Sequence, residues 1–219
     1  NEFGVPAYLD NDATAAAMGE LYFGAGVGVR NFAFFIVATG IGGGIIIDGR
    51  PYHGEGDNAG EFGHHKIRRN GPRCPCGDRG CVESLASGTS IARIAREGLA
   101  RRPNTLLWEW ISSPADVTAE LVARAARNSD AFASRVWFGA MYNLGLGVAN
   151  VVNILNPKRV ILGGGVAKAG EELFFEPVRR VVRKRAMPPL AADVDIVPAG
   201  NGDLVGLLGA VAVAVEAVE

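Results

Sequence analysis

The sequence has 219 residues, of which 48% are hydrophobic and 21% are charged, enough apolar material for one large domain or two small ones. Its net charge of −1 lacks the basic excess that is typical of nucleic-acid-binding proteins. No run of about 18 apolar residues indicates a membrane span, so we expect neither a nucleic-acid nor a membrane partner.

The first predicted elements surround an Asn-Asp pair. Residues 5–9 alternate as in a strand, and an alanine-rich helix is predicted over 13–23. Asn11 and Asp12 would then lie at the carboxyl end of a strand, where α/β folds bind their ligands. Two interpretations of Asp12 are equally supported: it removes a proton from an attacking hydroxyl, or it caps the helix.

Three consecutive antiparallel strands follow. They are predicted over 32–38, 45–47 and 50–53, with a turn at 39–44 and a hairpin pair, Asp48-Gly49. The turn reads Thr39-Gly40-Ile41-Gly42-Gly43-Gly44, and its successive backbone N–H groups would suit an anion such as phosphate. No Gly-Lys-Ser/Thr follows it, so it is not a Walker A loop, and a plain glycine-rich hairpin turn explains it at least as well.

A polar, glycine-rich segment over about 54–83 contains every cysteine, namely Cys74, Cys76 and Cys81. With one imidazole from His64 or His65, their spacing is typical of a structural zinc site. Buried thiols without a metal are the alternative, but the surrounding sequence is polar. Clustered thiols in a chain with no signal-peptide pattern also predict a reducing, cytoplasmic location.

Glu61 and Glu83 lie near the two ends of the cysteine segment. Carboxylates around a metal loop can accept hydrogen bonds from sugar hydroxyls. Solvated surface charge is the usual role of Glu and is the alternative here.

Helices are predicted over 84–100, 116–128 and 130–155, the second capped by Ser113 or Asp116. The third contains Gly139, Gly145 and Gly147, each of which costs about 1 kcal/mol relative to Ala in a helix. We therefore expect close packing against a neighbouring element at these glycines.

The last part of the chain alternates strand and helix. A strand over 159–162, a turn at 163–165 and a helix over 166–184 are followed by a strand over 194–197 and a helix over 203–218. Alternation of this kind predicts parallel neighbouring strands. The turn Gly163-Gly164-Gly165 either presents a helix N-terminus to a nucleotide phosphate or is an ordinary strand-to-helix turn.

Taken together, these motifs closely resemble the ROK family of sugar kinases and sugar-responsive repressors. Five blocks match in order: Leu9-Asp10-Asn11-Asp12-Ala13; Thr39 to Gly44; Gly60-Glu61-Phe62-Gly63-His64; Cys74 to Glu83; and Asn156-Pro157 leading to Gly163-Gly164-Gly165. The resemblance implies an α/β fold, the actin-like and hexokinase-like (ribonuclease H-like) ATPase lobe, with a mixed sheet, flanking helices and a zinc-binding insertion over about 54–83.

The resemblance also implies a role for each motif. Asp12 is expected to be the general base that activates the sugar 6-hydroxyl. The hexose-binding set would be Asn11, Asp12, Glu61, His64 and Glu83, and the zinc ligands would be His64, Cys74, Cys76 and Cys81. The nucleotide would contact Thr39, Gly40, Gly42, Gly163 and Gly164, with Mg²⁺ accompanying ATP.

One departure from the family pattern concerns the N-terminal side. Family kinases carry an Asp-x-Gly-Gly-Thr phosphate loop before the Asn-Asp pair, and family repressors carry a helix-turn-helix; neither occurs here. We therefore expect residues 1–219 to be the C-terminal, large lobe of a ROK-type kinase, inactive when isolated, with the N-terminal lobe missing from this chain.

Three functions follow as hypotheses. The first is ATP-dependent phosphorylation of a hexose, with glucose at O6 as the expected substrate and a homodimer as the expected assembly. The second is the effector-binding lobe of a ROK-type sugar-responsive repressor, and the third is a non-functional fragment. The intact Thr39-Gly40 motif favours the kinase.

Overall fold

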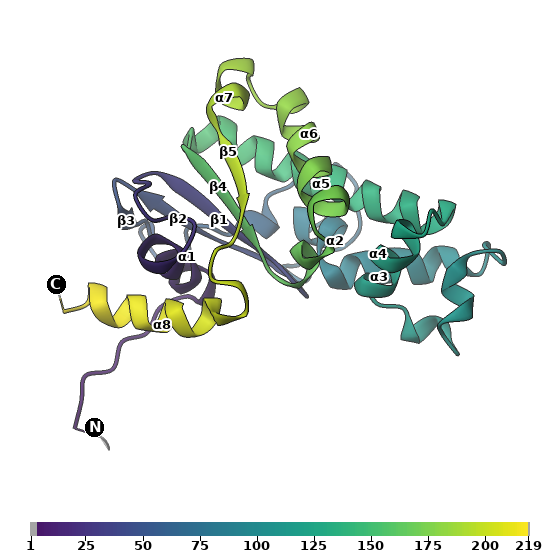
Figure 1. Ribbon diagram of the computed structural model, residues 1–219, viewed down its shortest axis with the longest axis horizontal. Helices are drawn as coiled ribbons and strands as arrows, with labels where there is room; N and C mark the ends of the chain where they lie inside the picture. Colours follow the sequence, from purple (N-terminus) through teal and green to yellow (C-terminus); the bar gives the residue numbers. More distant parts are fainter. Residues whose placement is uncertain (1–3, 219) are drawn as a thin grey trace.

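A mixed five-stranded sheet forms the centre of the computed structural model, which describes residues 4–218 (Figure 1). The spatial order is β3-β2-β1-β4-β5. As predicted, β1, β2 and β3 pair antiparallel, and β4 and β5 extend the sheet in parallel. The strand bounds are β1 (Phe32–Val37), β2 (Ile41–Ile47), β3 (Arg50–Pro51), β4 (Arg159–Gly163) and β5 (Asp195–Pro198).

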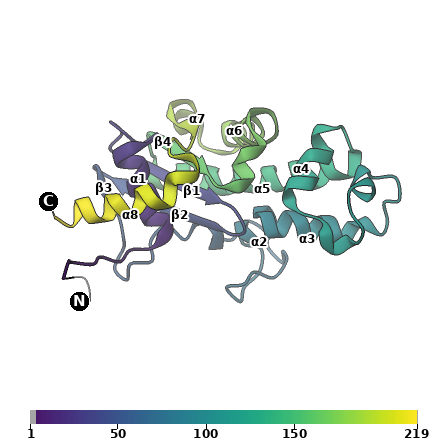
Figure 2. The ribbon, with the colours of Figure 1, turned by 60° about the horizontal axis from the view of Figure 1, so that its bottom comes forward.

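Helices cover both faces of the sheet (Figures 1 and 2). One face carries α1 (Asp12–Phe23) and α8 (Val205–Glu216), which pack on the smaller apolar cluster around Phe34 and Ile161. The other face carries α2 (Val82–Ala86), α5 (Ala131–Leu155), α6 (Glu176–Arg185) and α7 (Pro188–Asp193), while α3 (Gly88–Leu99) and α4 (Ala119–Arg127) pack on α5 beyond the edge of the sheet (Figure 1). Helix α7 was not predicted from the sequence.

Helix α5 organises the larger core. Trp137, Met141 and Leu144 are fully buried on it, and the Trp137 indole N–H donates to the Leu173 carbonyl at 2.7 Å. By length and composition alone α5 could cross a membrane, with a mean hydropathy of 1.3 in its most apolar window. Half of that window is buried inside this fold, so packing within the domain accounts for its apolar character.

The helix glycines behave as expected at two positions of three. A Cβ at Gly145 would lie 2.5 Å from the Cβ of Val181 on α6, and one at Gly147 would lie 2.9 Å from Val82. Both neighbours come too close for a side chain, so glycine is required there. Gly139 has nothing within 4 Å of such an atom, so the prediction of close packing is wrong at this position.

The predicted turn over 39–44 is wrong in its second half. Strand β2 begins at Ile41 and includes Gly42, Gly43 and Gly44. A Cβ at Gly44 would lie 2.6 Å from the Cβ of Ala17 on α1, and one at Gly43 would lie 2.2 Å from the ring of Phe62. The glycines therefore allow elements on both faces to approach the strand, and only 38–40 forms the turn.

The predicted strand over 5–9 is also wrong. This segment has no regular structure and no strand partner, and the side chain of Leu9 is 99% exposed. Regular structure begins after Asn11, whose side-chain oxygen accepts hydrogen bonds from the N–H groups of Ala13 and Thr14. Asn11 is therefore the N-cap of α1, and Asp12 is its first helical residue.

Other predicted helices are shorter than expected. Residues 84–100 divide into α2 and α3 at Ser87, which caps α3 by accepting from the Ser90 N–H. Thr118, rather than Ser113 or Asp116, caps α4. Residues 166–184 divide at Gly170, whose φ of +86° ends a 3₁₀ turn (Gly165–Ala169) before a π turn (Glu171–Phe175) and α6.

Candidate functional site

The three cysteines and His64 form one compact cluster. Their four ligand atoms all lie within 4.8 Å of one another. Cys74 Sγ is 3.5 Å from His64 Nδ1, and Cys76 Sγ is 3.7 Å from Cys81 Sγ. Tetrahedral zinc with ordinary bond lengths would separate two sulfur ligands by about 3.8 Å and a sulfur from a nitrogen by about 3.6 Å. The donor set and its spacing therefore fit a zinc ion.

The two adjacent histidines point to different surroundings. His64 directs Nδ1 at the cluster, while its Nε2 lies 3.8 Å from Glu61 Oε2. His65 is half-buried near Gly147 of α5, where a Cβ would lie 3.3 Å from its Cε1, and burial lowers its pKa. Of the two histidines, His64 belongs to the cluster. Its other ring nitrogen, Nε2, faces Glu61.

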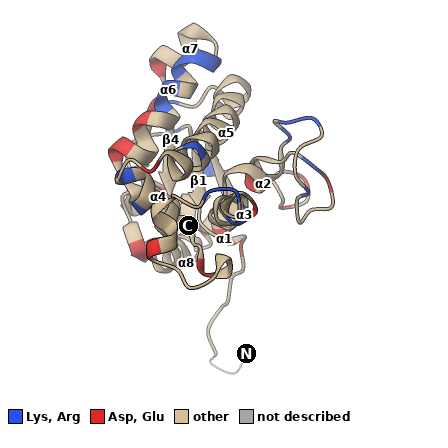
Figure 3. Ribbon diagram, turned by 90° about the vertical axis from the view of Figure 1, so that its right-hand side faces the viewer, with Lys and Arg blue, Asp and Glu red and all other residues tan. Residues whose placement is uncertain are grey.

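Burial disfavours ionisation of two of the three thiols, Cys74 and Cys81. It raises the pKa of Cys81 to about 12 and also raises the pKa of Cys74, whereas the Asp78 backbone N–H lowers the pKa of Cys76. A divalent metal reverses this preference, because thiols bind metals as thiolates. Basic residues edge the loop that projects beside α2, where their charge would offset that of three thiolates (Figure 3).

The predicted sugar-binding residues come from separate elements of the fold. Asn11 and Asp12 are at the first turn of α1, and Glu61 and His64 are at the 3₁₀ turn Phe62–His64. Asn11, rather than Asp12, serves as the helix cap, so capping does not occupy the Asp12 carboxylate. Both side chains at the start of α1 are exposed.

Glu83 joins the cysteine segment to the turn between β1 and β2. Its carboxylate accepts a hydrogen bond from the Ile41 N–H at 2.9 Å, and a Cβ at Gly40 would lie 2.7 Å from the same oxygen. Gly88, at the start of α3, donates to the Ala38 carbonyl at 2.7 Å. The start of α3 and the Thr39-Gly40 turn are therefore held together next to the cysteine segment.

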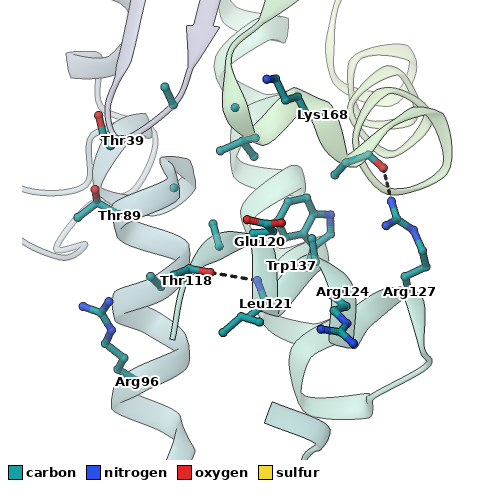
Figure 4. Close-up of a pocket in the computed structure, with 18 residues that line it drawn as sticks. Thr39, Thr89, Arg96, Thr118, Glu120, Leu121, Arg124, Arg127, Trp137 and Lys168 are labelled. Atoms are coloured by element: carbon teal, nitrogen blue, oxygen red, sulfur yellow. Dashed lines mark hydrogen bonds between the residues drawn. The ribbon is translucent and has the colours of Figure 1, made fainter. Parts of the chain in front are cut away.

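A cavity of about 860 Å³ opens beside Thr39 (Figure 4). Thr39 and Thr89 lie on one side of it and Lys168 on another, with Glu120 near Trp137 between them. This volume lies within the range of sites for nucleotide-sized ligands. Sequence reasoning placed only Thr39 here and missed the α3 and α4 residues, although the Ser87-Gly88-Thr89 helix start was a usable signal.

Cations outnumber acids around this cavity. Arg96, Arg124, Arg127 and Lys168 line it with a single carboxylate, Glu120. Lys168 is paired with Asp203, whereas the arginines bind neutral groups: Arg127 donates to the Ala169 carbonyl and Arg96 to the Val117 carbonyl, each at 2.7 Å, and Arg124 stacks on Trp110. The cavity therefore favours an anionic ligand.

The glycines predicted to contact a nucleotide do not line this cavity; Gly165 and Val166 do. Gly42 lies under α1, where a Cβ would come 3.1 Å from Ala13. Gly163 belongs to β4, and Gly164 has a φ of +94° with the Val37 carbonyl 2.4 Å from the position of a Cβ. Backbone packing thus explains the absence of side chains at these positions.

This sheet order, with helices on both faces of a mixed sheet, is that of the ROK sugar kinase fold of the actin-like ATPase superfamily. The chain belongs to the ROK family, whose model matches residues 1–217.

Its relatives include both kinases and repressors. A glucokinase from Halalkalibacterium halodurans is 40% identical over 95% of this chain and 63% of its own length. A xylose repressor from Caldicellulosiruptor bescii is 32% identical over 98% of this chain and 53% of its own length. The crystal structure of a ROK family glucokinase from Streptomyces griseus, in complex with glucose and AMPPNP, has a TM-score of 0.85 and 34% identity over 95% of this chain and 68% of its own. The chain thus spans about half to two thirds of these relatives.

Proposed function

We propose that the protein containing this chain phosphorylates a hexose, glucose at O6 being the expected substrate, with ATP as donor. The observation that carries the proposal is the basic cavity beside Thr39, which is large enough for a nucleotide. It adjoins the turn between β1 and β2, which Glu83 connects to the cysteine segment. An anion site in this position would suit the phosphates of a phosphoryl donor.

In this proposal Asp12 is the general base. Its carboxylate is free of helix capping, lies in the exposed first turn of α1, and would take the proton of the sugar hydroxyl as that hydroxyl attacks the γ-phosphorus. Asn11, Glu61, His64 and Glu83 would bind the other hydroxyls. The positive end of the α3 dipole, near Thr39 and Thr89, would favour the phosphates, with Mg²⁺ bound to ATP.

We further propose that His64, Cys74, Cys76 and Cys81 hold a structural zinc ion. Zinc would fix the loop and orient the His64 ring through Nδ1, leaving Nε2 to donate to a sugar hydroxyl beside Glu61. The free thiols that such a site needs also support the proposed cytoplasmic location.

Residues 1–219 would form one lobe of a two-lobed enzyme and have little activity alone. The start of α8 supports this division, since Leu204 just before the helix and Leu207 and Val211 within it form an exposed apolar stripe that a second lobe would cover. The share of each relative that this chain spans agrees with a further lobe. A homodimer remains a prediction from the family resemblance.

The test uses the natural full-length protein with ATP and glucose, mannose, fructose or N-acetylmannosamine. Asp12→Asn should lower kcat by at least about 100-fold while calorimetric glucose binding persists, because the amide cannot accept the proton. Asp48→Asn, in the exposed hairpin turn, is the matched control. Unchanged turnover in Asp12→Asn would refute the base assignment.

The alternative function is the effector-binding lobe of a sugar-responsive repressor. The similarity to the xylose repressor of C. bescii supports it. A full-length protein that binds a hexose but transfers no phosphate from ATP would favour this alternative over the kinase.

A further inference from the structure

The position of Asp12 is the starting point, because no strand leads into it. The residues before it are exposed coil, and Leu9 is 99% exposed. On the carboxyl side, α1 is held against β2 through the close approach of Ala13 to Gly42. On the amino side, Asp10 is the residue among the described positions 4–10 whose side chain makes hydrogen bonds.

Asp10 uses both of its carboxylate oxygens. Oδ1 accepts the backbone N–H of Asn11 at 2.7 Å, and Oδ2 accepts a hydrogen bond from His53 Nε2 at 2.9 Å. The Asp10 side chain is only 11% exposed, against 34% for His53. A charge-assisted hydrogen bond shielded in this way is stronger and more directional than a fully exposed ion pair.

His53 lies at the start of the segment that leads to the other half of the proposed sugar site. It follows β3, and its carbonyl accepts the Ala59 N–H at 2.9 Å, at the entry to the turn that carries Glu61 and His64. The Glu61 carbonyl in turn accepts the His64 N–H at 3.0 Å. The Asp10–His53 hydrogen bond therefore connects the backbone before Asp12 to the loop that carries the predicted sugar ligands.

We propose that His53 is a positioning residue for phosphoryl transfer: through Asp10 it sets the distance between the Asp12 carboxylate and the hexose held by Glu61 and His64. This inference rests on the proposed kinase function. It assigns no contact with substrate to His53 or Asp10. Removing the pair should leave sugar binding nearly intact but place the base in a less productive geometry.

The test compares His53→Leu with His53→Gln in the full-length protein, using steady-state kinetics with glucose and ATP. We expect His53→Leu to lower kcat about tenfold to hundredfold, with KM for glucose changed by less than about threefold, since small displacements of a base are costly. His53→Gln retains an N–H donor and should recover most of kcat. Arg30→Gln, which breaks the exposed Arg30–Asp48 pair, is the control and should match wild type.

Three results would overturn the inference: a kcat within about twofold of wild type in His53→Leu, a loss confined to KM, or a Gln variant no better than Leu. Thermal unfolding and calorimetric glucose binding of each variant separate positioning from misfolding, and Asp10→Ala, which removes both oxygens, provides a second route to the same break. If wild type is active while His53→Leu is unaffected, only this inference fails. If wild type transfers no phosphate, the proposed function fails, and the inference with it.

Discussion

Asp130 offers the sharpest test of how α5 is held. Its Oδ1 accepts the Ala133 N–H at 2.7 Å as the helix N-cap, and its Oδ2 accepts the Leu106 N–H at 2.8 Å. The residue is 8% exposed. Asp130→Ala removes the cap, worth about 1 kcal/mol, and leaves a shielded N–H without a partner, worth about 1–3 kcal/mol.

The expected loss is therefore about 2–4 kcal/mol in the free energy of unfolding. For a chain of this size the midpoint of thermal unfolding should fall by about 10 °C. Asp130→Asn can still cap Ala133 through its single oxygen but loses the bond to Leu106, so its loss should be about half as large. Circular dichroism and tryptophan fluorescence during urea and thermal unfolding measure both variants.

The pH dependence provides an independent check. Burial tends to raise the pKa of Asp130, but the N–H groups of Ala133 and Leu106 outweigh it and hold the pKa below 3.8. A lowered folded-state pKa stabilises the fold above the unfolded value, and this contribution disappears as pH falls through the folded value. Wild type should thus lose stability below about pH 4 more steeply than Asp130→Asn. An Asp130→Ala variant within about 0.5 kcal/mol of wild type would refute the reasoning.

Two further predictions concern packing and the metal. Gly145→Ala should destabilise by about 1–3 kcal/mol, because its Cβ would meet Val181 at 2.5 Å, whereas Gly139→Ala in the same helix, with nothing within 4 Å, should stabilise by up to about 1 kcal/mol. Equal effects in urea unfolding would contradict this. The protein should contain about one equivalent of zinc by elemental analysis, and Cys81→Ser or a chelator should remove it and lower the unfolding midpoint. Less than about half an equivalent in unchelated wild type would count against the site.

The sequence predicted the elements whose reasons are local. The apolar run at 32–37 and the periodic apolar residues of α5 are visible without neighbours, and Asp130 marks a helix start by its residue type. The cysteine cluster was also predictable, because the spacing of Cys74, Cys76 and Cys81 brings the thiols together within one loop.

What the sequence did not reveal depends on distant partners. Gly44 is required because Ala17 packs against it, and Gly43 is required because Phe62 does. Neither contact is visible in the sequence, and these glycines were therefore interpreted as part of a phosphate-binding turn. The cavity beside Thr39 combines side chains from α3, α4 and the turn after β4, which periodicity cannot align. Residues 5–9 alternate like a strand but have no neighbouring strand to pair with.

The glycines of β2 have an evolutionary consequence. Gly42 and Gly44 have no side chains and face Ala13 and Ala17 of α1. The distance between α1 and strand β2 therefore depends on the absence of a Cβ at these two positions and not on any functional group. Asp12 is in the first turn of that helix, so an added methyl at either glycine would displace the carboxylate without touching it. We expect the glycine and alanine positions to covary among homologues, with larger residues on one element tolerated only where the facing element has become smaller. Differences in turnover number between family members would then arise from substitutions at these packing positions, although none of them is a catalytic residue.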